Sequence, residues 1–195
     1  MSTLVTRQAP DFTADAVFAD NTIHKLTLSA YRGRHVVLFF YPLDFTFVCP
    51  SEILAFNKAI KQFAARGTDV IGVSVDSAYT HYAWRNVPPA QGGIGQVGFP
   101  LVADLDKSIA RAYGVLLNEA VALRGLFLID QAGVVQHALV NNLPLGRNVD
   151  EALRIVDALQ FTEKHGEVCP ANWKAGEEAM TASAEGVAAY LRKHA

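Results

Sequence analysis

The sequence has little charge, and the charge it has is nearly balanced in sign. Charged residues make up 18% of the 195 positions, against roughly 25% in typical globular domains. The 17 Lys and Arg against 19 Asp and Glu leave a net charge of −2, so the basic surface that nucleic-acid binding requires is missing. With 51% hydrophobic residues, the sequence is typical of neither a disordered chain, a collagen nor a coiled coil. The low charge indicates either a large core or a surface that another subunit covers.

Long apolar segments are also missing. The longest plain apolar run, Val36–Tyr41, is far shorter than the ~20 residues that a membrane-spanning helix needs. The N-terminal residues contain no apolar stretch followed by a small-residue cleavage site, so we expect no signal peptide. These absences predict a cytoplasmic protein without a membrane segment. A length of 195 residues suits a single domain.

Cysteine is scarce, since only Cys49 and Cys169 are present. A cytosolic chain is not expected to keep a structural disulfide, which leaves thiol chemistry or inert burial. Glu52 stands where a Cys-x-x-Cys motif would place its second cysteine, so any disulfide must join distant segments or two chains. The six histidines show no ligand spacing, and we expect no metal site. The glycine-rich run 92–95 lacks the Lys and Ser or Thr of a phosphate-binding loop, and no nucleotide cofactor is expected.

The order of the expected elements predicts an α/β protein with a thioredoxin-like fold. The apolar runs 36–41 and 69–75 are typical of strands buried on both faces, and a helix from Pro50 to about Arg66 is expected between them. A right-handed crossover unit followed by a hairpin unit, with a helix on each face, gives this fold. We predict one domain over residues 1–195, with an N-terminal β-hairpin extension and a C-terminal helical tail from residue 165. The other expected elements are hairpins at 12–28 and 125–140, a strand at 99–103, and helices at 77–85, 106–113, 148–164 and 180–193.

The segment from Pro42 to Glu52 is the most informative for chemistry, because it joins a buried strand to the start of a helix. Cys49 occupies the expected N-cap position, where unpaired N–H groups and a partial positive charge favour a thiolate over a thiol. Cysteines in such positions are activated nucleophiles, and the alternative interpretation is an inert buried thiol. Pro42 ends the strand because proline has no N–H for the ladder.

Two motifs carry a resemblance to a known family. The segment around Cys49 resembles the active-site signature of the peroxiredoxins, the family of alkyl hydroperoxide reductase C and the thiol-specific antioxidant proteins: it reads Pro42-x-x-x-Thr46-x-x-Cys49-Pro50. Residues 168–173, Val-Cys-Pro-Ala-Asn-Trp, resemble the second-cysteine segment of their typical two-cysteine group. The likeness runs from about residue 9 to residue 192.

This resemblance implies a thiol peroxidase for hydrogen peroxide and small organic hydroperoxides that needs no cofactor. Cys49 would attack the peroxide and become a sulfenic acid, and Cys169 would condense with it to form a disulfide. Thioredoxin or a flavoprotein disulfide reductase would then reduce this disulfide. The family also implies a homodimer with disulfides between subunits, often arranged as a decamer of five dimers.

The resemblance also implies supporting roles for residues near the two cysteines. The Thr46 hydroxyl would donate to the sulfur or to a peroxide oxygen, and Pro42 would form a pocket wall that keeps water from the thiolate. Arg124, just before an expected strand, would clamp a peroxide oxygen. Glu52 at the third helical position could reach back to the backbone N–H at the helix start. Its charge near a thiolate makes sense if it also anchors Arg124 or Arg147.

Two other functions stay open as hypotheses. A holdase chaperone would use the apolar surface of an oligomer, and its activity need not depend on the Cys49 thiolate. A disulfide oxidoreductase is opposed by the missing Cys-x-x-Cys motif. Replacing Cys49 separates a chaperone from a peroxidase, because only the peroxidase loses its activity.

Overall fold

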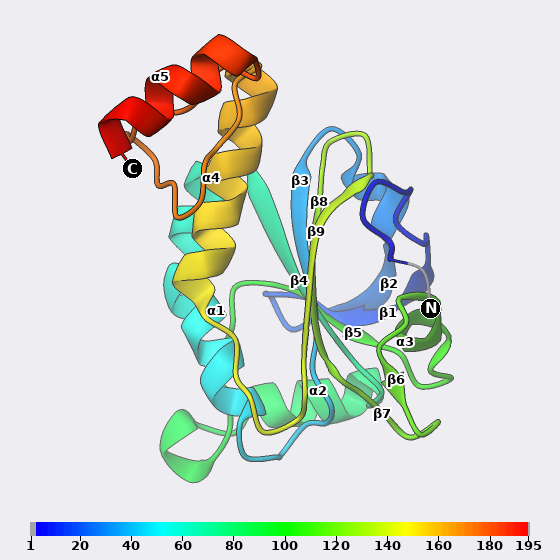
Figure 1. Ribbon diagram of the computed structural model, residues 1–195. Coiled ribbons are helices and arrows are strands. Elements are labelled where there is room, and N and C mark those ends of the chain that lie inside the picture. The colour runs from blue at the N-terminus through cyan, green and yellow to red at the C-terminus, as the bar shows by residue number, and fades with distance from the viewer. Residues whose placement is uncertain (1–2, 195) are drawn as a thin grey trace. The chain divides into compact units, whose positions relative to one another are not determined.

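The computed structural model describes residues 3–194 and divides into two compact units, Met1–Val149 and Asp150–Ala195. The first unit contains a mixed β-sheet with helices on both faces, and the second is helical (Figure 1). Within residues 3–194, no helix is long and apolar enough to cross a membrane.

A seven-stranded sheet forms the centre of the first unit. The strands of the structure are β1 (Thr13–Val17), β2 (Ile23–Thr27), β3 (His35–Phe40), β4 (Thr68–Ser74), β5 (Leu101–Ala103), β6 (Leu116–Leu117), β7 (Val121–Ala122), β8 (Arg124–Ile129) and β9 (Val135–Asn141). The order across the sheet is β2-β1-β5-β4-β3-β8-β9, while β6 and β7 form a separate pair. Neighbours among β3, β4 and β5 run parallel and all other pairs run antiparallel. This arrangement confirms the predicted crossover unit, the β8–β9 hairpin unit and the N-terminal hairpin extension.

The helices connect these strands and form the second unit. They are α1 (Cys49–Ala65), α2 (Ala78–Arg85), α3 (Ser108–Ala112), α4 (Val149–His165) and α5 (Ala184–His194), with short 3-10 turns η1 (Leu28–Tyr31) and η2 (Pro89–Gln91). In Figure 1 the sheet of the first unit is seen nearly edge-on, with α1 on one side and α3 on the other. The crossover helix α1 joins the parallel neighbours β3 and β4, so its first turn lies at the carboxyl end of β3.

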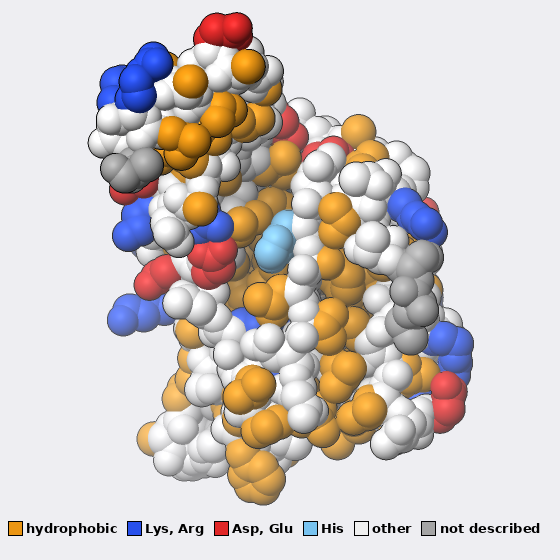
Figure 2. All heavy atoms as spheres, viewed as in Figure 1, with side chains coloured by type: hydrophobic (Ala, Val, Ile, Leu, Met, Phe, Trp, Pro, Cys, Tyr) orange, Lys and Arg blue, Asp and Glu red, His pale blue; other side chains and the backbone are white. Residues whose placement is uncertain are grey.

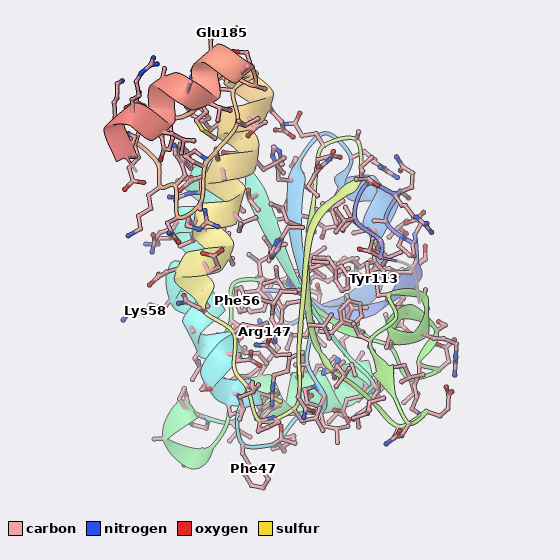
Figure 3. The ribbon with its side chains drawn as sticks, in the orientation of Figure 1. Phe47, Phe56, Lys58, Tyr113, Arg147 and Glu185 are labelled. Carbon is pink, nitrogen blue, oxygen red and sulfur yellow. The ribbon has the colours of Figure 1, made fainter. Side chains whose placement is uncertain are left out.

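Strand β3 is buried on both faces, as its apolar run predicts. Adjacent residues of a strand point to opposite faces. Phe39 therefore stacks on Phe56 of α1, with ring centroids 4.5 Å apart, whereas Phe40 packs against Tyr113 at 5.2 Å and Phe127 at 5.8 Å. Figure 3 shows Phe56 and Tyr113 on the two sides of the sheet. This double burial fixes the strand that leads directly into the segment around Cys49.

Both predicted hairpins are confirmed, and their turns explain why they form. Asn21 in the β1–β2 turn has φ 65° and Gly133 in the β8–β9 turn has φ 76°. Asn and Gly are the residues that adopt this left-handed region at least cost. The β6–β7 pair was not predicted, because strands of two residues are too short to show an alternating pattern.

The prediction that Cys49 is the N-cap of its helix was wrong by one residue. Helix α1 begins at Cys49, and its N-cap is Val48, which has helical backbone angles of φ −83° and ψ −34°. Pro50 follows as the second helical residue, where its missing N–H is still not needed for an intrahelical bond. The thiol therefore lies in the first turn, within reach of the same unpaired N–H groups.

The last helix begins later than predicted, at Ala184 rather than near Met180. Met180 is paired with Val168 through two backbone hydrogen bonds of 2.8 and 3.0 Å, and this bridge keeps it out of the helix. The Ser183 side chain then accepts a hydrogen bond of 3.0 Å from the backbone N–H of Gly186, which is the geometry of an N-cap. In the second unit, Cys169 therefore lies in the stretch between α4 and α5, directly after the bridged residue Val168.

Candidate active site

Cys49 is fully buried in the first turn of α1, and Thr46 lies directly beside it. The Thr46 Oγ1 atom is 2.9 Å from Cys49 Sγ and 2.8 Å from the backbone oxygen of Leu43. A hydroxyl has a single proton and donates it to one of these acceptors at a time. Thr46 thus donates to the sulfur of a thiolate, and turns to Leu43 when the sulfur is itself a donor.

Arg124, the first residue of β8, also reaches the sulfur. Its Nη1 atom is 3.4 Å from Cys49 Sγ and donates a hydrogen bond of 2.6 Å to Glu52 Oε2. Its Nε atom donates to the backbone oxygen of Leu143 at 2.6 Å. Glu52 and Leu143 therefore fix a buried guanidinium against the sulfur, where it stabilises negative charge.

Glu52 does not reach back to the start of its helix, and that part of the prediction was wrong, because its two carboxylate oxygens accept hydrogen bonds from residues outside α1. Its carboxylate lies between two arginines instead, Arg124 at 2.6 Å and Arg147 at 2.8 and 3.0 Å. The sequence analysis expected Glu52 to anchor either Arg124 or Arg147, and in the structure it anchors both. A buried carboxylate with two guanidinium partners is fully paired and leaves one positive charge in excess. A thiolate at Cys49 balances this excess.

The side chain of Arg147 is also enclosed, with 1% of it exposed. It donates to the backbone oxygens of Phe40 at 2.7 Å and Gly125 at 2.6 Å, and its guanidinium carbon lies 5.1 Å from the ring centroid of Phe39. Burial lowers the pKa of Arg147 from its usual value, while the hydrogen-bonded Glu52 carboxylate opposes this shift. Figure 3 shows Arg147 between α1 and the sheet, where it ties the two together.

Pro42 is buried, two residues beyond the end of β3, in the loop that leads to Cys49. The side chains of Thr46, Glu52 and Arg124 therefore gather around Cys49 in the first unit, and Pro42 lies in the loop that carries Thr46. Within residues 3–194, no group of three His, Cys, Asp or Glu side chains could hold a metal ion.

A buried polar network under the same loop was not predicted. Asp44 accepts hydrogen bonds from the Tyr41 hydroxyl at 2.8 Å and from His81 Nδ1 at 2.7 Å, and its backbone N–H donates to Asp76 at 2.7 Å. Burial raises the pKa of Tyr41 well above its usual value, so its hydroxyl stays protonated and donates. This network fixes the start of the loop. The sequence carried one indication of this network, because His81 falls at the helical spacing of the residues that α2 buries.

Cys169 belongs to the second unit and is partly buried. Its sulfur lies 3.7 Å from the backbone oxygen of Ala158 and 3.8 Å from the hydroxyl of Thr162, both on α4. Neither Ala158 nor Thr162 was predicted as a neighbour of this cysteine. The number of residues between α4 and the cysteine does not indicate which side chains come into contact.

Comparisons with known proteins find matches over nearly the whole chain. The model of the AhpC/TSA family matches residues 5–138, and the model of the C-terminal domain of 1-Cys peroxiredoxin matches residues 158–193. Alkyl hydroperoxide reductase C of Helicobacter pylori is 56% identical over 193 residues, covering 98% of both chains. Peroxiredoxin-2 of Mus musculus is 53% identical over 189 residues, covering 96% of this chain and 95% of its own. The reduced 2-Cys peroxiredoxin of Plasmodium vivax superposes with a TM-score of 0.97 at 53% identity, covering 98% of this chain and all of that one.

Proposed function

The chain belongs to the AhpC/TSA family of peroxiredoxins and is a thiol-dependent peroxidase, and from this premise we propose that Cys49 is the cysteine that attacks the peroxide. One observation carries this proposal: Cys49 Sγ lies 2.9 Å from the Thr46 hydroxyl and 3.4 Å from the Arg124 guanidinium. Two donors aimed at one buried sulfur stabilise a thiolate and leave it ready to react.

In the first step, the Cys49 thiolate attacks the distal oxygen of a peroxide. The new S–O bond forms as the O–O bond breaks, and the departing oxygen takes a proton to leave as water or an alcohol. Thr46 and Arg124, whose donors lie at the sulfur, bind the two peroxide oxygens in this proposal as charge moves from the sulfur to the leaving group. Pro42, buried in the preceding loop, supplies an apolar wall that keeps water from the sulfur.

In the second step, Cys169 condenses with the Cys49 sulfenic acid to form a disulfide and water. Thioredoxin or a flavoprotein disulfide reductase then returns both cysteines to thiols by thiol–disulfide exchange. The expected substrates are hydrogen peroxide and small organic hydroperoxides, and the reaction uses no cofactor. The two compact units serve one catalytic cycle, and we treat them as a single peroxidase domain of a cytoplasmic protein.

Assembly into a homodimer and a decamer is supported by apolar side chains that are exposed in the single chain. Phe47 is 96% exposed, Tyr79 is 78% exposed and Phe45 is 54% exposed. Figure 3 shows Phe47 projecting outward from the loop before α1, and Figure 2 shows apolar side chains gathered at this end of the face in view. Apolar patches of this kind mark protein interfaces. Strand β9 lies at one edge of the seven-stranded sheet, and an edge strand can pair with a strand of a second subunit.

The test separates the two cysteines. Cys49→Ser should abolish turnover of hydrogen peroxide, whereas Cys169→Ser should retain a single stoichiometric reduction per chain. Stopped-flow assays with thioredoxin or a flavoprotein reductase as electron donor identify the reductant. Multiple turnovers by Cys49→Ser would overturn the assignment of the nucleophile. Non-reducing gels of the oxidised protein should show a disulfide-linked dimer that collapses with dithiothreitol, and sedimentation of the reduced protein reports the decamer.

A further inference from the structure

Two loops leave the sheet together at the edge that carries Cys49. Strands β3 and β4 are parallel neighbours, so the loop that leads to Cys49 and the loop that leads to α2 begin at the same edge (Figure 1). Asp76 lies in the second loop, two residues beyond the end of β4, and is partly buried. Its Oδ2 atom accepts a hydrogen bond of 2.7 Å from the backbone N–H of Asp44 in the first loop. One carboxylate therefore joins the two loops.

The peptide group that Asp76 binds also faces Thr46. The backbone N–H of Asp44 and the backbone oxygen of Leu43 belong to the same peptide unit, which is planar. The oxygen of this unit lies 2.8 Å from Thr46 Oγ1, the hydroxyl that is 2.9 Å from Cys49 Sγ. A rotation of the peptide would move its two ends together. The bond to Asp76 therefore also fixes the carbonyl beside Thr46.

The backbone between this peptide and Thr46 is strained. Phe45 has φ 53°, in the left-handed region that bulky side chains seldom adopt because of its steric cost. Such a conformation persists only where neighbouring contacts over-determine it. These contacts are made by Asp44, whose carboxylate accepts hydrogen bonds of 2.8 and 2.7 Å in a buried network while its N–H donates to Asp76. Loss of the bond to Asp76 would let Phe45 relax and would move the residue that follows it.

We propose that Asp76 is a positioning residue for the peroxide step, because it fixes the peptide group that orients the Thr46 hydroxyl toward the Cys49 sulfur. Asp76 acts through Thr46 and not by binding the peroxide itself. This inference rests on the proposed role of Cys49 as the nucleophile. A displaced hydroxyl no longer stabilises the charge that develops in the reaction, so the rate falls while the reacting atoms stay the same.

The first experiment removes the carboxylate in the full chain. Asp76→Ala should slow the reaction of Cys49 with one equivalent of hydrogen peroxide by about tenfold, which corresponds to ~1.4 kcal/mol for one hydrogen bond to a charged group. Stopped-flow single turnovers measure this rate. Asp76→Asn keeps an oxygen that accepts the same N–H and should stay within about twofold of the wild-type rate. A loss in Asp76→Asn as large as that in Asp76→Ala would overturn positioning by this hydrogen bond.

The matched control is Asp130→Ala. Asp130 also follows a strand, is partly buried and accepts a backbone hydrogen bond, at 2.8 Å from the N–H of Val134. Because β8 runs antiparallel to β3, Asp130 lies at the amino end of β3, whereas Cys49 follows the carboxyl end. Asp130→Ala should therefore change the peroxide rate by less than about twofold. Equal losses of rate in Asp76→Ala and Asp130→Ala would overturn the proposal.

A double-mutant cycle tests whether Asp76 acts through Thr46. In a Thr46→Val background, which has no hydroxyl to position, Asp76→Ala should slow the peroxide step by less than about twofold. Residues that act independently would instead multiply their effects. A full tenfold loss in the Thr46→Val background overturns the proposal.

Hydrogen exchange followed by mass spectrometry separates positioning from general stability. In Asp76→Ala, amide exchange should become faster in a peptide that covers residues 41–48 and stay at the wild-type rate in a peptide that covers residues 130–134. Asp130→Ala should show the reverse. An equal increase over the whole chain in Asp76→Ala would mean that this residue only stabilises the fold, and would overturn the proposal.

The Cys49→Ser variant keeps the two levels of inference apart. If this variant still turns over hydrogen peroxide, the proposed role of Cys49 is wrong. If it is inactive, and Asp76→Ala costs the same rate with and without the Thr46 hydroxyl, that role stands and only the inference about Asp76 is wrong.

Discussion

The two cysteines have neighbours of the same kinds, but these neighbours differ in distance. Thr46 Oγ1 lies 2.9 Å from Cys49 Sγ, whereas Thr162 Oγ1 lies 3.8 Å from Cys169 Sγ. Each threonine hydroxyl also has a backbone carbonyl as a second acceptor. At Cys49 the short contact favours donation to the sulfur, while at Cys169 the better acceptor is the helix carbonyl. The first site directs a close donor at its sulfur, and the second leaves its sulfur with only long contacts.

The arginine–glutamate pairs show the same contrast in burial. The side chains of Arg124 and Glu52 are 4% and 3% exposed, whereas those of Arg154 and Glu151 are 24% and 42% exposed. Charges act strongly at low dielectric and weakly where water and salt screen them. The Cys49 site is thus rigid and preorganised for the peroxide. The Cys169 site is held more weakly, which suits a segment that must leave its resting contacts to meet another cysteine.

The largest difference between the two sites should appear in stability. Glu52→Gln leaves two buried arginines without a carboxylate, and breaking a buried ion pair from one side costs about 3–5 kcal/mol. Glu151→Gln breaks an exposed pair and should cost no more than about 1 kcal/mol. Urea unfolding of the reduced proteins measures both. Equal losses in the two variants would mean that burial does not distinguish the sites.

The next largest effect should appear in the peroxide reaction of Cys49. Arg124→Lys keeps the charge but loses the fork that reaches Glu52, Leu143 and the sulfur together. Loss of one oriented donor at such a site lowers a rate by about 10²–10³-fold. Stopped-flow single turnovers measure this rate directly. A variant that reacts with peroxide at the wild-type rate would show that charge alone suffices and that the fork has no role.

A smaller effect is expected from the two threonines. Thr46→Val removes a donor to a buried sulfur and should slow the peroxide reaction about 10- to 100-fold, the value of one hydrogen bond to a charged group. Thr46→Ser keeps the hydroxyl and serves as the control. Thr162→Val should change the rate of disulfide formation by less than about threefold, because its contact to Cys169 is long and partly exposed. A larger effect at Thr162 than at Thr46 would reverse the comparison.

Much of the fold followed from local pattern. The run 36–41 predicted a strand buried on both faces, and Asn21 and Gly133 mark the turns of both hairpins. The boundary at Met180 was missed because a non-local bridge to Val168 competes with helix formation there. Pairing between segments far apart in the sequence leaves no periodic signal.

The first cysteine site was more predictable than the second, for a physical reason. Cys49 and Thr46 lie within one turn of each other, so spacing alone brings them together. Glu52 was expected to hold Arg124 or Arg147, and only the packing of α1 on the sheet shows that it holds both. The hydrogen bond from Arg154 to the Cys169 segment depends on how a chain without regular structure folds back on α4, which no spacing encodes.

The smallest predicted effect is a difference in salt dependence between the two sites. Raising the ionic strength from about 0.1 M to about 1 M shortens the Debye length from about 10 Å to about 3 Å, which weakens exposed charge interactions and leaves buried ones nearly unchanged. The reaction of Cys49 with hydrogen peroxide should therefore change by less than about 1.5-fold. The free-energy difference between the wild-type protein and Glu151→Gln should fall by about half, because the Arg154–Glu151 pair is partly exposed. Hydrogen peroxide is uncharged, so salt does not alter its approach to the protein. The cost of Glu52→Gln should stay nearly constant, and an equal salt effect on both variants would show that burial does not shield the Arg124–Glu52 pair.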